Sequence, residues 1–155
     1  MSHYYLDSSA IVKRYVAETG TVWINNLCLT SSGHVLYTVR ITGAEIVAAL
    51  FRRARTGALA TSDAQAAATR FKADYYGRYQ VIEVNERLID LAMMLAEKHG
   101  LRGYDSVQLA AALELQAVRA LASLSAITFV CADNKLNSAA VSEGLSAENP
   151  NTPLP

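Results

Sequence analysis

The sequence predicts an α/β protein built on a parallel sheet that is covered by helices on both faces. The chain has 155 residues and is 52% hydrophobic, which suits one globular domain with a single core. Apolar runs rich in β-branched and aromatic residues alternate along it with stretches of helical periodicity. This alternation is typical of parallel sheets, which bind ligands at the carboxyl ends of their strands.

Four segments have the apolar, β-rich character of buried strands. These are residues 4–6, 35–41, 80–84 and 127–132. The stretch 144–148 can add one short last strand. We expect helices to connect these segments, because parallel neighbours need long crossover connections.

Helical periodicity and terminal signals place the helices between the strands. Asn85 is an expected N-cap, Gly57 and Gly100 are expected C-terminal stops, and the spacing from Ser62 to Gln65 fits a capping box. The expected helices cover residues 10–16, 21–29, 42–56, 62–76, 86–99 and 104–122, and a further one contains residues 136–141.

Domain length, apolar runs and cysteine spacing indicate the general class of protein. We expect one domain over residues 1–148 and a flexible tail over 149–155, which holds all three prolines. An 18-residue apolar run and a secretory leader are both absent, so we expect a soluble cytoplasmic protein without membrane contact. Cys28 and Cys131 lack C-x-x-C spacing and are expected to be reduced, buried thiols.

The charge balance limits nucleic-acid binding to a local patch. Lys plus Arg and Asp plus Glu number 14 each, so the overall field does not attract a polyanion. The densest basic stretch, FRRARTG, lies near a predicted helix end, where cations also favour the helix dipole. Seven basic residues are candidate RNA contacts, although solvated surface is the ordinary role of each: Lys13, Arg14, Arg40, Arg52, Arg53, Arg55 and Arg102.

Four acidic residues stand at junctions between strands and helices. Taken singly, each has an ordinary explanation at a helix N-terminus. Asp7 and Asp133 follow apolar strands and can cap the next helix. Glu45 can reach back to the Thr42 amide in a capping box, and Asp105 can cap the long helix in the same pattern.

Taken together, the four acids favour a metal site. Adjacent parallel strands end at one edge of the sheet, so these carboxylates are expected to lie close together. Two carboxylates about 5 Å apart repel by roughly 3 kcal/mol at an effective dielectric of 20, which protons or cations must relieve. Oxygen ligands alone suit Mg²⁺ or Mn²⁺, and water activated at such an ion can hydrolyse phosphodiesters. The sequence therefore predicts a metal-dependent nuclease.

Four segments also match a known family in order and approximate spacing. They are YYLDSSAIVKRY, TGAEIVAAL, LRGYDSVQLAAAL and FVCADNKLNSAAVSEGL. Over residues 4–145 the chain resembles PIN-domain proteins, in particular the VapC-type toxins of prokaryotic toxin–antitoxin pairs. The resemblance implies a three-layer α/β/α sandwich with a parallel sheet of about five strands. It also implies an endoribonuclease dependent on Mg²⁺ or Mn²⁺, a homodimer, and an antitoxin whose C-terminal segment covers the cleft.

The resemblance assigns roles to five residues. The acidic residues of the family map onto Asp7, Glu45, Asp105 and Asp133, and its hydroxyl maps onto Ser9. Asp7 and Asp105 are expected to be the firmest metal ligands, with Glu45 and Asp133 as further or water-mediated ligands. Ser9 is expected to orient Asp7 through a hydrogen bond.

Two other functions stay open at this point. The chain could be a PIN-like module that binds RNA or protein without cleaving it, or a housekeeping RNA-processing nuclease. An aspartyl phosphatase would need a second Asp two residues after Asp7, where Ser9 stands. A P-loop or dinucleotide-binding domain would need a Gly-rich turn after a strand, and the sequence has none.

Overall fold

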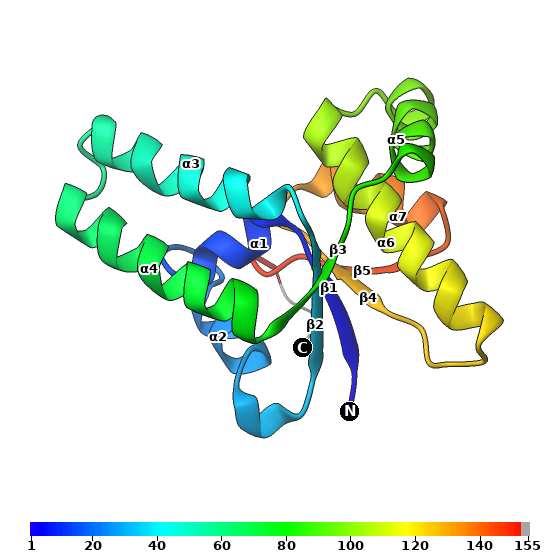
Figure 1. Ribbon diagram of the computed structural model, residues 1–155, viewed down its shortest axis with the longest axis horizontal. Helices are drawn as coiled ribbons and strands as arrows, with labels where there is room; N and C mark the ends of the chain where they lie inside the picture. The colour runs from blue at the N-terminus through cyan, green and yellow to red at the C-terminus, as the bar shows by residue number, and fades with distance from the viewer. Residues whose placement is uncertain (153–155) are drawn as a thin grey trace.

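The computed structural model describes residues 1–152 and has the predicted three-layer α/β/α architecture (Figure 1). Its central sheet has five parallel strands in the order β3-β2-β1-β4-β5. The strands are β1 (His3–Leu6), β2 (Val35–Val39), β3 (Tyr79–Ile82), β4 (Thr128–Val130) and β5 (Ser146–Glu148).

Helices cover both faces of the sheet, with the two halves of the chain on opposite sides (Figure 1). The first group is α1 (Ser8–Ile11), the 3₁₀ helix η1 (Val12–Arg14), α2 (Thr21–Leu27), the 3₁₀ helix η2 (Thr30–Ser32), α3 (Thr42–Arg55) and α4 (Thr61–Gly77). The second group is α5 (Glu86–His99), α6 (Gly103–Leu121) and α7 (Asn134–Ser142).

The central strand β1 supplies side chains to a separate core on each face. Tyr5 and Leu6 are both fully buried, but successive strand residues point to opposite faces. Tyr5 packs with the α5–α7 side, where it stacks on Phe129 at 5.6 Å between ring centroids. Leu6 packs with the α1–α4 side, whose core includes Phe71 of α4. The sheet is therefore buried on both faces, as parallel sheets require.

The strand order creates a switch point beside β1. The chain adds β2 and β3 on one side of β1, and β4 and β5 on the other. In register, Leu6 pairs with Val130, so Asp7 leaves β1 at the level where β4 ends. The Asp7 amide continues the ladder by donating to the Val130 carbonyl at 3.1 Å. Open α/β sheets bind ligands at such a point.

Some of the helix ends predicted from the sequence agree with the structure, and others do not. Asn85 caps α5 by accepting from the Leu88 amide at 2.9 Å, and Gly100 ends that helix at a φ of +62°, as predicted. The first helix starts earlier than predicted, at Ser8, and tightens into a 3₁₀ helix at Val12.

The predicted capping boxes are wrong, because each helix begins earlier than its box requires. In α6 the N-cap is Arg102, which leaves Asp105 inside the first turn. The N-caps of α3 and α4 are Ile41 and Ala60, and neither helix has a side-chain cap. Glu45 is consequently free to bond elsewhere.

The beginning of the predicted tail lies against the domain. Pro150 is buried, and Asn149 donates to Asn134 Oδ1 at 2.8 Å. Residues 153–155 of the predicted tail lie outside the described residues. Within residues 1–152, no helix is both long enough and apolar enough to cross a membrane. Cys28 and Cys131 are free, buried thiols, as predicted.

A pair of glycine variants measures how tightly residue 150 is packed. Gly20 has a φ of +90°, and a Cβ there would lie 2.7 Å from the Pro150 carbonyl oxygen. Gly57 has a φ of +77° and open space around it. Gly57→Ala is therefore expected to lower the free energy of unfolding by about 1 to 2 kcal/mol, which is the backbone strain alone. Gly20→Ala should cost more than that in urea titrations.

Deleting residues 149–155 serves as the control for this comparison. In the shortened chain the two alanine substitutions are expected to cost the same, because only strain is left. Equal costs in the full-length chain would show that Pro150 does not pack against Gly20 in solution.

Candidate active site

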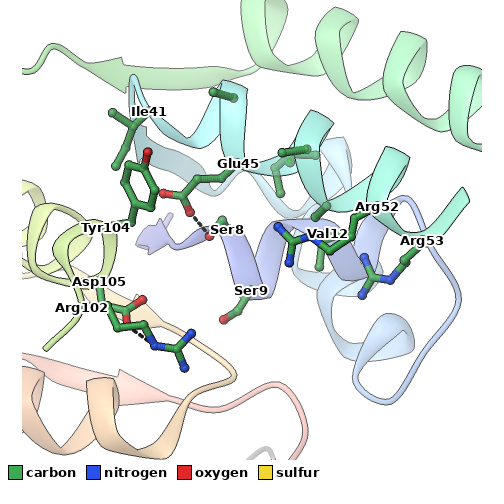
Figure 2. A pocket seen from close by; sticks show the side chains of 14 residues that line it. Ser8, Ser9, Val12, Ile41, Glu45, Arg52, Arg53, Arg102, Tyr104 and Asp105 are labelled. Carbon is green, nitrogen blue, oxygen red and sulfur yellow. Dashed lines mark hydrogen bonds and ion pairs between the residues drawn. The ribbon is translucent and has the colours of Figure 1, made fainter. Parts of the chain in front are cut away.

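A cleft of about 710 Å³ opens at the carboxyl end of the sheet (Figure 2). Its walls come from α1 and η1, from α3, and from the start of α6. Glu45, Tyr104 and Asp105 lie at one end of it, Arg52 and Arg53 lie at the other, and Ser8 and Ser9 lie between them. The cleft therefore has an acidic end and a basic end.

Asp7 lies beneath this cleft and is only 3% exposed. Its Oδ1 accepts from the Ala10 amide at 2.9 Å, so Asp7 is the N-cap of α1, as predicted. Burial raises its pKa from 3.8 to about 6, although hydrogen bonds from Ser9, Cys131 and Ala10 oppose the rise. A carboxylate in this position is costly to ionise and firmly oriented.

Ser9 provides the hydrogen bond to Asp7 that the resemblance implied. Its Oγ donates to Asp7 Oδ1 at 2.7 Å and accepts from the Ala132 amide at 2.9 Å. Ser9 thus ties the acid at the end of β1 to the segment that follows β4.

Cys131 makes a second link between the same two segments, which the sequence analysis did not foresee. Its thiol donates to Asp7 Oδ2 at 3.1 Å and accepts from the Asp133 amide at 3.2 Å. Burial, followed by the Asp7 charge, raises the pKa of this thiol well above its ordinary value. Cys131 is therefore a neutral hydrogen-bonding group that holds Asp7 close to the backbone of Asp133.

Glu45 points from the first turn of α3 into the cleft. Its Oε2 accepts a hydrogen bond from Ser8, and its Oε1 lies 3.4 Å from Gln108 Nε2. Burial raises its pKa, the Ser8 and Gln108 bonds lower it, and the Asp105 charge raises it. Glu45 is consequently a better proton acceptor than an ordinary surface glutamate.

A buried polar chain supports Glu45 from behind. Tyr5 donates to Gln108 Oε1 at 2.8 Å, and Gln108 donates to the Thr42 hydroxyl at 2.9 Å. Thr38 also donates to Thr42, at 2.8 Å. This network was not predicted from the sequence, although a glutamine within the apolar stretch VQLAAAL was a signal for it.

Asp105 and Asp133 lie beside a smaller cavity of about 120 Å³, which they line together with Arg102 and Lys135. Asp133 caps α7 by accepting from the Leu136 amide at 3.0 Å, as predicted. Burial raises the pKa of Asp105, Arg102 lowers it, and Asp133 raises it. The Arg102 Nε lies 3.9 Å from Asp105, with the guanidinium in solvent.

Three of the four predicted acids, Glu45, Asp105 and Asp133, therefore lie along one rim with Asp7 buried beneath it, rather than all four around one point. Repulsion between neighbours contributes to the raised pKa values of three of them: Glu45 acts on Asp7, Asp105 on Glu45, and Asp133 on Asp105. Within residues 1–152, no three His, Cys, Asp or Glu side chains are close enough together to hold a metal ion between them.

Only some of the candidate RNA contacts line the cleft. Lys13 is buried against Glu18, and Arg14 pairs with Asp74 at 3.0 Å, so these two side chains support the fold. Arg40 pairs with Glu83 at the surface. The cationic residues that line the cleft are Arg52, Arg53 and Arg102.

Comparison with known proteins supports the fold. No protein-family model matches the chain, and no curated protein matches it. The structure of FitAB bound to an IR36 DNA fragment is 16% identical, with a TM-score of 0.64 over 98% of each chain. VapBC2 from Rickettsia felis, bound to a promoter DNA fragment, is 17% identical, with a TM-score of 0.61 over 95% of this chain and 98% of its own.

A third solved structure, FitAcB from Neisseria gonorrhoeae, is also 17% identical. Its TM-score is 0.57 over 95% of this chain and 97% of its own. The likeness to VapBC2 confirms, for the fold, the resemblance to VapC-type proteins that the motifs indicated.

The raised pKa of Asp7 leads to a pH-dependent effect of Asp7→Asn. Between pH 3.8 and about 6 the unfolded chain loses this proton while the folded chain keeps it, so stability falls as pH rises. Above about pH 6 the ionised Asp7 costs about 3 kcal/mol in full. Asp7→Asn cannot ionise, so in EDTA it is expected to be more stable than the wild type at pH 8 and nearly equal to it at pH 4.

Chemical denaturation at several pH values measures this difference. Asp63→Asn, in the exposed first turn of α4, is the matched control for the loss of one carboxylate, and its effect on stability is expected to change with pH less than that of Asp7→Asn. A pH-independent difference for Asp7→Asn would contradict the raised pKa.

Proposed function

We propose that this protein is an endoribonuclease dependent on Mg²⁺ or Mn²⁺ and the toxin of a toxin–antitoxin pair. One observation carries the proposal: four acids far apart in the sequence come together at the switch point of a parallel sheet, three along the rim of an open cleft and Asp7 buried beneath it. The fold shared with VapBC2 supports the toxin assignment, because the sequence motifs resemble VapC-type toxins.

The donor set fits a hard divalent ion. The rim offers carboxylate oxygens, and Mg²⁺ typically uses one or two carboxylates together with waters and substrate phosphate. Such an ion therefore does not require a preformed group of three acids. Asp7 and Asp105 are the first candidates to hold it, with Glu45 and Asp133 as further or water-mediated ligands. When bound, the ion would activate water and stabilise charge developing on the phosphate.

The protein residues supply orientation and proton acceptance. Ser9 and Cys131 fix the two oxygens of Asp7, so this acid needs little rearrangement when it acts. Glu45 has a raised pKa and faces the cleft, which suits a group that accepts a proton from the attacking water. Removal of that proton makes the water a stronger nucleophile toward phosphorus, and the proton can then pass to the departing oxygen as its bond to phosphorus breaks.

The remaining roles concern partners. From the resemblance and the shared fold, we propose that this protein binds an antitoxin and that the antitoxin binds at the cleft. A homodimer belongs to the same proposal. A non-cleaving binding module is the second candidate, and it is favoured by the burial of Asp7, which is only 3% exposed.

A cleavage assay separates the two candidates. Purified protein is expected to cleave a structured RNA with Mg²⁺ or Mn²⁺ and to lose activity in EDTA. Asp7→Asn and Asp105→Asn should each lower the rate at least about 100-fold, because several kcal/mol of charge stabilisation depend on the ion and about 1.4 kcal/mol is tenfold in rate.

Asp63→Asn is again the matched control, since it removes one exposed acid from outside the cleft and should leave the rate unchanged. Cleavage that resists EDTA would refute the metal mechanism. RNA binding without cleavage at any metal concentration would support the non-cleaving module.

A further inference from the structure

Tyr104 is an exposed aromatic residue at the acidic end of the cleft. The residue is 67% exposed, so its ring can be reached from the cleft that it lines. Figure 2 shows the ring next to Glu45 and on the same helical turn as Asp105. Among residues 1–152 it stacks on no other aromatic ring. One face of the ring is therefore available to a planar ligand group.

Arg52 and Arg53 form the basic end of the cleft, on the wall that α3 provides. Arg53 pairs with Glu18 at 2.9 Å, while Arg52 is exposed and forms no ion pair within the described residues. Arg52 lies seven residues after Glu45 on α3, so it is about 10 Å along the same helix face. Arg55 has the same charge in the same helical turn but does not line the cleft.

An aromatic ring and a cation some distance along the same groove are suited to binding a nucleic-acid strand. A base that is free to leave its stack can lie on an aromatic face, and Arg binds the backbone phosphates. The distance of about 10 Å spans at most about three nucleotides, because about 3.4 Å is the rise of a fully stacked strand and an extended strand covers more per nucleotide. A strand with its reacting phosphate at the acids would therefore place another phosphate near Arg52.

We propose that Tyr104 is a base-stacking platform beside the acids and that Arg52, supported by Arg53, is a separate phosphate subsite no more than about three nucleotides away. The proposal rests on the proposed function, because it assumes that RNA enters this cleft. It goes beyond that function by naming the two points that fix the register of the strand. An acidic segment of a protein is the competing ligand for Arg52.

Binding without cleavage tests the two points directly. Fluorescence anisotropy of a labelled 12-nucleotide single-stranded RNA in EDTA measures affinity over a range of salt concentrations. Arg52→Gln is expected to lower the slope of log affinity against log salt by about 0.7, the value for one phosphate contact with a single strand. Arg55→Gln removes the same charge outside the cleft and should leave the slope unchanged.

The platform is tested with three tyrosine variants. Tyr104→Ala is expected to weaken binding at least about 5-fold, in line with the loss of one stacked base, whereas Tyr104→Phe should bind like the wild type. Tyr76→Ala is the matched control, because Tyr76 is 80% exposed on α4 outside the cleft.

RNAs with one neutral methylphosphonate linkage then locate the subsite. One linkage is expected to weaken wild-type binding but not binding by Arg52→Gln. The proposal is overturned if Arg52→Gln and Arg55→Gln behave alike, if Tyr104→Ala binds like the wild type, or if the wild type does not bind RNA. It is also overturned if Arg52→Gln loses only the binding of a co-purified protein.

The outcomes separate this proposal from the proposed function. If the wild type cleaves RNA but the Arg52 and Tyr104 variants bind RNA like the wild type, the two subsites are refuted and the nuclease assignment stands. If RNA binding depends on both residues but no cleavage occurs, the two subsites stand and the nuclease assignment is refuted.

Discussion

Burial of the Asp7 carboxylate is the constraint on which the site depends. The strand order places β1 in the middle of the sheet, and the Asp7 amide extends the pairing with β4. The side chain therefore cannot turn to solvent, and burial raises its pKa to about 6. Hydrogen bonds from Ala10, Ser9 and Cys131 offset part of the cost and fix its orientation. The buried Asp7 carboxylate therefore lowers stability at neutral pH, and its side chain is held in one orientation.

The cleft shows how ordinary helix electrostatics can produce a functional charge pattern. Acidic residues are favoured in the first turn of a helix and basic residues in the last. On α3 these preferences place Glu45 at one end and Arg52 and Arg53 at the other. The chain has no net charge, yet the cleft has an acidic end that can hold a cation and a basic end that can hold a phosphate.

The sequence predicted those features that depend on local pattern. The alternating strands and helices predicted the layered fold, and the caps at Asp7, Asn85 and Asp133 were recognisable because each acts within three residues. The boxes at Glu45 and Asp105 failed because both helices start early, which a short motif cannot reveal. Contacts such as Tyr5 to Gln108 and Asp7 to Cys131 join residues more than 100 positions apart, so only the fold could show them.

The most direct test of the central claim is to locate Mn²⁺ in crystals by its anomalous scattering. A peak in contact with at least two of the carboxylates of Asp7, Glu45, Asp105 and Asp133 is expected, and Asp105→Asn should weaken or abolish it. No peak at this rim at millimolar Mn²⁺, or a peak only at acids elsewhere on the surface, would contradict a metal site formed by these four residues.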